Sequence, residues 1–125
     1  MKKIINTPNA PAPIGPYSQA VQVGKTLYVS GQVAINPATG EMDMADIPTE
    51  TRRVMENLKA ILTQVNATFD NVVMTTIFLS DMGDFAAVNA VYGTYFTGNF
   101  PARATVAVKT LPKNVNVEIS VIASL

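Results

Sequence analysis

The stretch VNVEISVIASL, residues 115–125, alternates apolar and polar side chains and predicts a β-strand near residues 116–124. In such a strand the apolar side chains at positions 117, 119 and 121 point to one face, whereas Glu118 and Ser120 point to the other. A carboxylate therefore lies inside a mainly apolar strand at the end of the chain.

The preceding stretch, FPARATVAV at residues 100–108, predicts another strand, near residues 102–108. Alternation places Arg103 on one face of this strand, together with Thr105 and Ala107. The chain thus ends in two strands, and each of them carries one charged residue among apolar neighbours.

Two further strands are predicted near the start of the chain. Residues 18–23 and 26–31 flank Gly24-Lys25, a two-residue connection with glycine at the first turn position, which is typical of a β-hairpin. The segment 6–16 before them contains four prolines, so we expect an ordered, extended arm without a sheet ladder.

The middle of the chain predicts a helix, a strand and a second helix. The first helix begins near residue 46, with Pro48 and Glu50 in its first turn. Its apolar residues recur at helical spacing: Val54, Leu58, Ile61, Leu62 and Val65. Residues 71–79 predict a buried strand, and residues 84–97 predict the second helix. One side of that helix is apolar, with Phe85, Val88, Tyr92, Tyr95 and Phe96.

The order of these elements, two strands, helix, strand, helix and two strands, indicates an α+β fold in which two helices cover one face of one sheet. The 125 residues are enough for one domain with a single core. Apolar side chains make up 48% of the sequence and charged ones only 14%, against roughly 25% in soluble domains. We therefore expect the uncovered sheet face to be buried in contacts between subunits.

Composition excludes several classes of function. Nine basic residues balance nine acidic ones, so no long-range field attracts nucleic acid or an anionic membrane. No apolar segment has the length of a signal-peptide core or a membrane span, which predicts a cytoplasmic protein. Cysteine and histidine are absent, and this argues against thiol catalysis, a Ser-His-Asp triad and the usual zinc sites.

Three polar residues interrupt apolar patterns: Arg103, Glu118 and Asn89, the last within the apolar stripe of the second helix. One interpretation is structural, with Arg103 and Glu118 as an ion pair and Asn89 bonded to a cap or loop carbonyl. The other is a polar binding site. Tyr17 and Ser30 lie near the hairpin, where tyrosine and serine are more often packing and turn residues than catalysts.

Five separate blocks of the sequence resemble the reactive intermediate deaminase, or RidA-type, family. They are IGPYSQAV (14–21), YVSGQVAINPATGE (28–41), DFAAVNAVY (84–92), FPARATVAV (100–108) and LPKNVNVEISVIA (111–123). The resemblance spans nearly the whole chain, in consistent order. It implies a chorismate mutase-like fold, assembled as a homotrimer with the sheets facing the trimer interior and ligand clefts between subunits.

The resemblance also implies an activity. Such proteins hydrolyse the enamine and imine acids that pyridoxal-phosphate-dependent serine and threonine dehydratases release, giving 2-oxo acids and ammonia without a metal or cofactor. By position, Arg103 corresponds to the carboxylate-binding arginine and Glu118 to the glutamate that positions water. The cleft-lining positions are Tyr17, Ser30, Gly31, Asn89 and Thr105. Many relatives have cysteine in place of Thr105, a change that a role played by the backbone N–H would survive.

The chemistry of these residue types agrees with the implied reaction. Arginine presents a bidentate fork to a carboxylate, and a glutamate can orient water, accept its proton and protonate the leaving amine. Two alternatives remain: a non-catalytic module that binds small carboxylates such as 2-oxo acids, and an RNA-cleaving or chaperone-like protein.

The sequence leaves the distance between the two charged residues open. If the last two strands formed a simple hairpin, Glu118 would lie opposite residue 107, roughly 13 Å from Arg103 along the strand. The fold implied by the resemblance inserts the last strand elsewhere in the sheet. Arg103 and Glu118 of one site could then come from the same subunit or from two.

Overall fold

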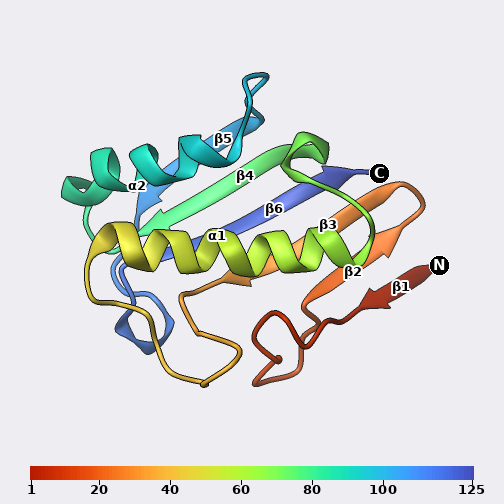
Figure 1. The fold of residues 1–125 in the computed structure, drawn as a ribbon, viewed down its shortest axis with the longest axis horizontal. Helices are drawn as coiled ribbons and strands as arrows, with labels where there is room; N and C mark the ends of the chain where they lie inside the picture. Colours follow the sequence, from red (N-terminus) through yellow and green to blue (C-terminus); the bar gives the residue numbers. More distant parts are fainter.

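The computed structural model describes residues 1–125 and has two helices packed on one face of a six-stranded mixed sheet (Figure 1). The strands are β1 (Lys2–Ile5), β2 (Ala20–Val23), β3 (Thr26–Gln32), β4 (Val72–Leu79), β5 (Ala102–Ala107) and β6 (Val117–Ser124). The helices are α1 (Ile47–Gln64) and α2 (Phe85–Tyr92). The α+β class predicted from the sequence is confirmed.

The last strand lies in the middle of the sheet. The strand order is β1-β2-β3-β6-β4-β5, with β6 antiparallel to both β3 and β4, and β5 parallel to β4 at the edge. A simple hairpin of the last two strands is therefore wrong, because β4 separates them. The physical reason is burial, because a central strand can bury its apolar side chains under α1 more completely than an edge strand can. The apolar residues of β6 on this face are almost fully buried: Val117, Ile119, Val121 and Ala123.

Local sequence explains where α1 begins and which face it buries. The side chain of Asp46 accepts a hydrogen bond from the Thr49 backbone N–H and caps the first turn, which also contains Pro48 and Glu50. Four of the five predicted stripe residues are fully buried: Val54, Leu58, Ile61 and Leu62. Val65 is the C-cap and packs against the core from its edge.

Two elements differ from the sequence prediction. The second helix ends at Tyr92 and continues as the 3-10 helix Gly93–Tyr95, so it does not run to residue 97 as one α-helix. Glycine and threonine at 93 and 94 are weak helix formers, which favours the tighter turn there. The strand β1 was not predicted; it pairs with β2 and extends the sheet edge.

The proline-rich arm is ordered, as predicted, and forms no strand. The buried side chain of Gln19 accepts a hydrogen bond from the Thr7 N–H and donates to the carbonyls of Thr7, Ala10 and Pro11. The predicted hairpin is also confirmed, since Val23 pairs with Thr26 across Gly24 and Lys25. Neither helix combines the length and the apolar character that crossing a bilayer would require.

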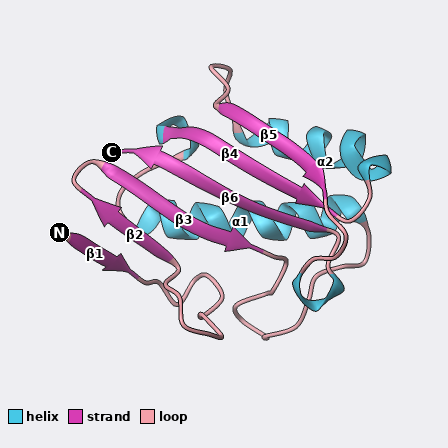
Figure 2. Cartoon of the chain, turned by 180° about the vertical axis from the view of Figure 1, so that it is seen from behind, coloured by secondary structure: helices cyan, strands magenta, loops and turns pink.

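The face of the sheet opposite the helices has no cover in the chain (Figure 2). Apolar side chains nevertheless lie on it. Tyr28 and Val106 are about half exposed, at 49% and 46%, and Met74, Phe78 and Ile122 are partly buried beside them. This uncovered face is the surface for which the composition predicts a protein partner.

Candidate functional site

The predicted site residues form two groups on opposite faces of the sheet. In the register of β4 and β5, Arg103 pairs with Thr75, which is 1% exposed and points toward the helices. In the register of β4 and β6, Glu118 pairs with Phe78, whose neighbours Ile77 and Leu79 are the buried, helix-facing residues. Within one chain Arg103 therefore lies on the helix face and Glu118 on the uncovered face.

The structural ion pair between these two residues is consequently absent. The chain has one side-chain salt bridge, between Arg53 and Asp43 at 3.0 Å. Arg103 instead donates from Nη1 to Oδ1 of Asn89 on α2, at 2.7 Å. This contact also shows the partner of the Asn89 side chain, which is the arginine. The expected bond from Asn89 to a cap or loop carbonyl is not formed.

The Arg103 half of the site is a hollow of about 490 Å³ between α2 and the start of β5. Asn89 occupies one guanidinium nitrogen and leaves the others free to bind a ligand. The hollow is lined by Asn89, Tyr92, Gly93, Phe100, Pro101 and Arg103. A small carboxylate fits the geometry of the remaining N–H donors.

Two aromatic residues in this half were predicted only as packing residues. The Cζ atom of Arg103 lies 5.4 Å from the ring centroid of Phe85 and 5.2 Å from that of Tyr92. Their spacing of seven residues places both on the inner side of α2, so the sequence signal for contact with the sheet was present. That spacing did not indicate that the two rings contact Arg103.

The Glu118 half of the site is built around a β-bulge in β3. Between Val29 and Gln32 the register with β6 shifts, so an extra residue of β3 is accommodated beside Glu118. A Cβ atom on Gly31 would lie 2.6 Å from Oε2 and 2.8 Å from Cδ of Glu118. Only glycine therefore lets the carboxyl group rest on the backbone of β3.

Burial raises the pKa of the Glu118 carboxyl above its usual value, because the charged form loses hydration there. The adjoining hollow has a volume of about 400 Å³. It is lined by Ile14, Tyr17, Ser30, Gly31, Val33, Ile35, Pro112, Lys113 and Glu118. Three of the predicted cleft residues, Tyr17, Ser30 and Gly31, are thus brought together with the glutamate.

The hydroxyl groups of Ser30 and Tyr17 in this half differ in how firmly hydrogen bonds hold them. The Oγ of Ser30 donates to the carbonyl of Ser18 at 2.6 Å, and its backbone N–H donates to the carbonyl of Gln19. Ser30 is therefore held in place, and its hydroxyl can only accept a hydrogen bond from a ligand. Tyr17 is half exposed at the rim, and its hydroxyl accepts a bond from the Ile14 N–H at 3.4 Å.

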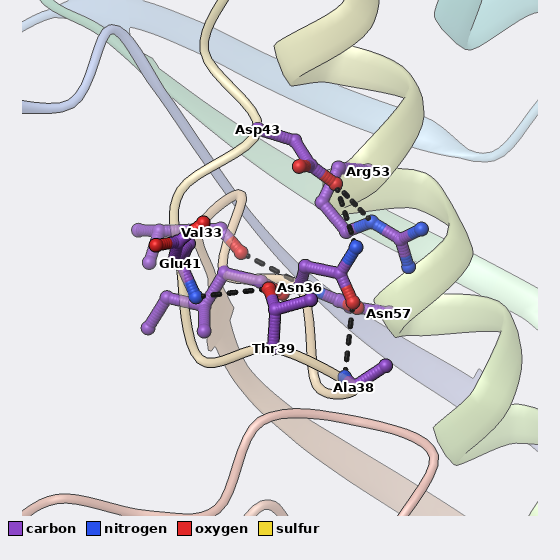
Figure 3. Close-up of polar contacts among 9 residues, drawn as sticks. Val33, Asn36, Ala38, Thr39, Glu41, Asp43, Arg53 and Asn57 are labelled. Atoms are coloured by element: carbon purple, nitrogen blue, oxygen red, sulfur yellow. Dashed lines mark hydrogen bonds and ion pairs between the residues drawn. The ribbon is translucent and has the colours of Figure 1, made fainter.

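Buried polar residues of α1 fix the walls of the Glu118 half. Asn57, fully buried, donates from its side chain to the carbonyls of Val33 and Ile35, at 3.1 and 2.9 Å (Figure 3). Glu50, also fully buried, accepts hydrogen bonds from the backbone N–H groups of Asn116 and Val117, directly before Glu118. Both contacts tie segments distant in sequence to the same helix.

Thr105 is the one predicted cleft residue that lines neither hollow. It lies on β5, two residues after Arg103 and on the same face, paired with Ile77. Its hydroxyl oxygen is buried and has no hydrogen-bond partner within the chain.

Comparison with known proteins shows the family of the chain. Residues 7–125 match the family model described as endoribonuclease L-PSP, which is also the YjgF/RidA family. The chain belongs to this family. Its members carry different names: the chain is 56% identical to Protein DfrA of Myxococcus xanthus, over 98% of this chain and 95% of that one.

Another YjgF/RidA relative is the mouse 2-iminobutanoate/2-iminopropanoate deaminase, 48% identical over 98% of this chain and 91% of its own. Among solved structures, E. coli TdcF with bound serine superposes with a TM-score of 0.94 at 40% identity, covering 98% of each chain. The two-helix, six-strand fold is therefore that of the YjgF/RidA family.

Proposed function

We propose that the protein is a 2-iminobutanoate/2-iminopropanoate deaminase, which hydrolyses reactive imine acids to 2-oxo acids and ammonia. The observation that carries this proposal is the Glu118 carboxyl, seated on Gly31 in a hollow where burial raises its pKa. A raised pKa suits a group that must act first as a base and then as an acid near neutral pH. The name of the mouse relative supports the substrate class.

In this proposal Arg103 binds the substrate carboxylate. The guanidinium forms a bidentate pair with it, while Asn89 holds Nη1 from the other side. The carboxylate is attached directly to the imine carbon, so fixing it also fixes the reacting atom.

Glu118 activates the water. The substrate reacts as the protonated imine: as the water oxygen bonds to its carbon, one water proton passes to Glu118 and a carbinolamine with an uncharged amine forms. Glu118 then returns that proton to the nitrogen, and the carbon–nitrogen bond breaks. The hydroxyl proton leaves as the 2-oxo acid forms, passing through Glu118 to ammonia, so ammonium is released and the carboxylate is regenerated.

Because the two residues lie on opposite faces of one sheet, we infer that each cleft is shared between two subunits of a homotrimer. Arg103, with Asn89, comes from one subunit and Glu118, with Tyr17, Ser30 and Gly31, from its neighbour. The uncovered apolar sheet face supports such an assembly, since it would be buried in the trimer interior. The whole chain, residues 1–125, acts as one domain in it.

A coupled assay tests the activity. The protein is added at substoichiometric amounts to a threonine dehydratase, and the appearance of 2-oxobutanoate is followed. We expect faster release of the 2-oxo acid, and an unchanged rate contradicts the proposal. Arg103→Lys should lower kcat/KM by about a hundredfold, nearly as much as Arg103→Ala, because a point charge does not reproduce bidentate geometry.

A second candidate is a non-catalytic binder of small amino or 2-oxo acids, which the serine bound to TdcF favours. The two functions differ at Glu118. For a deaminase, Glu118→Gln keeps affinity for 2-oxobutanoate in calorimetric titration while turnover falls by about two orders of magnitude or more. If the wild type binds 2-oxobutanoate but does not accelerate imine hydrolysis, the non-catalytic binder is favoured.

A further inference from the structure

We propose that Phe85 and Tyr92 are positioning residues that hold the Arg103 guanidinium between their rings in the orientation needed to bind a carboxylate. The inference rests on the proposed function, in which Arg103 is the carboxylate ligand. We call the pair of rings, Phe85 and Tyr92, the aromatic clamp. The clamp adds to the site two residues that the sequence pattern had assigned only to the core.

The geometry of Arg103 explains why a clamp is needed. The residue lies on the edge strand β5 and is exposed in the chain, so its long side chain would otherwise sample many rotamers. The two ring centroids lie 5.4 and 5.2 Å from Cζ, within the range of cation–π attraction. Together with the 2.7 Å bond to Asn89, they restrict the guanidinium by three contacts from one helix.

The clamp is itself anchored to the sheet. The hydroxyl of Tyr92 is hydrogen-bonded to Oγ1 of Thr75 at 2.9 Å, and both residues are buried, at 4% and 1% exposure. Thr75 is the register partner of Arg103 on the neighbouring strand. The ring that contacts the arginine is therefore fixed to the strand beside it, and it also packs against the ring of Phe96, with centroids 4.9 Å apart.

The clamp orients the arginine without neutralising it. No carboxylate forms an ion pair with Arg103, because the only salt bridge of the chain joins Arg53 and Asp43. Aromatic faces attract the cation but leave its N–H edge free, whereas an acidic partner would compete with the ligand for the same donors. Such an arrangement is suited to an anionic substrate that must bind and leave repeatedly.

The test compares Phe85→Leu and Tyr92→Leu with a matched control, Phe69→Leu. Phe69 belongs to the same aromatic cluster, 5.4 Å from Phe96, and has no cation–π contact with Arg103. We expect each clamp variant to raise the Kd for 2-oxobutanoate about tenfold, with a smaller change in kcat at saturation. The control should lose stability in urea and keep its affinity; equal Kd values in all three variants and the wild type contradict the clamp.

A second variant pair covers the case in which a leucine variant fails to fold. Tyr92→Phe keeps the ring and removes only its bond to Thr75, so it should raise Kd less than Tyr92→Leu. In an Arg103→Lys background, Phe85→Leu should raise Kd by less than it does in the wild type, because the pair it disrupts is already altered. Full additivity of the two changes would contradict a role that acts through the arginine.

A structural measurement separates this inference from the proposed function. In the wild type, the side-chain Nε–H resonance of Arg103, assigned by comparison with Arg103→Lys, should show a ring-current shift that Phe85→Leu and Tyr92→Leu reduce. If that shift is present and the wild type binds no 2-oxo acid, the clamp exists and the proposed ligand is wrong. If the wild type binds 2-oxobutanoate and accelerates imine hydrolysis and no shift is seen, the clamp is wrong and the proposed function stands.

Discussion

At the scale of single residues, the charged carboxyl of Glu118 lowers the stability of the folded protein. Desolvation raises the pKa of its carboxyl above the usual 4.5, so the folded protein holds this proton more tightly than the unfolded chain does. Folding stability therefore falls as pH rises from 4.5 through the folded-state pKa, and the loss is complete above it.

This loss predicts a stability gain on mutation. Glu118→Gln should be more stable than the wild type at neutral pH, and the difference should vanish below pH 4.5, where both forms are uncharged. Urea denaturation of both proteins across this pH range measures it. A variant that is less stable than the wild type at neutral pH would show that the charge of Glu118 has a stabilising partner.

Gly31 sets the position of the same carboxyl. In Gly31→Ala the new Cβ would lie 2.6 Å from Oε2, so the glutamate must move away from β3. We expect turnover to fall by about a hundredfold, since a displacement of about 1 Å can have that effect, while 2-oxobutanoate still binds through Arg103. Steady-state kinetics and calorimetry on one preparation check this, and wild-type turnover would mean that the carboxyl need not rest on the glycine.

At the residue scale, the sequence predicted the outstanding side chains better than their contacts. Arg103, Glu118 and Asn89 were recognisable because each interrupts an apolar pattern. Their separation onto two faces was not readable, because it depends on which strands neighbour β6 and β5. The aromatic partners of Arg103 were assigned to packing, since helical spacing alone does not distinguish a core ring from one that touches a cation.

At the scale of elements, the loop of residues 33–43 forms one wall of the Glu118 half and is attached to α1 by two kinds of contact. Asn57, fully buried, binds the carbonyls of Val33 and Ile35. Arg53 forms its ion pair with Asp43 at the surface, where the two side chains are 27% and 33% exposed (Figure 3).

The two contacts should differ in energy. Asn57→Ala leaves the Ile35 carbonyl without a donor, while the Val33 carbonyl keeps only the Ile35 N–H, and should reduce the free energy of unfolding by about 2 kcal/mol. Arg53→Ala breaks a solvated pair and should cost less than about 1 kcal/mol. Urea denaturation of both variants tests the order. If Arg53→Ala is the more destabilising change, the ion pair holds the loop and the amide does not.

The elements themselves were largely predictable, with instructive exceptions. The helix α1, the hairpin of β2 and β3, and the strands β4 to β6 follow from periodicity and turn residues. The strand β1 has only four residues, and three of them are exposed, so no alternating pattern marks it. The early end of α2 was missed because its apolar residues continue at helical spacing through the 3-10 helix Gly93–Tyr95.

At the scale of the whole molecule, the low charge content and the uncovered sheet face point to the same conclusion. Charged residues are only 14% of the sequence, and apolar side chains lie on the face opposite the helices. Within one chain, moreover, the two charged residues of the proposed site lie on opposite faces of the sheet. A trimer with shared clefts would account for all three observations.

The central claim is that each active site combines Arg103 of one subunit with Glu118 of another, and mixing two inactive variants tests it most directly. Arg103→Ala and Glu118→Gln are unfolded together in equal amounts, refolded, shown by light scattering to be trimers, and assayed for imine hydrolysis. About one quarter of the clefts should then contain both wild-type residues, because each cleft draws them independently from two subunits. We therefore predict that the mixture recovers about a quarter of wild-type activity, whereas activity no higher than that of either variant alone would contradict the shared site.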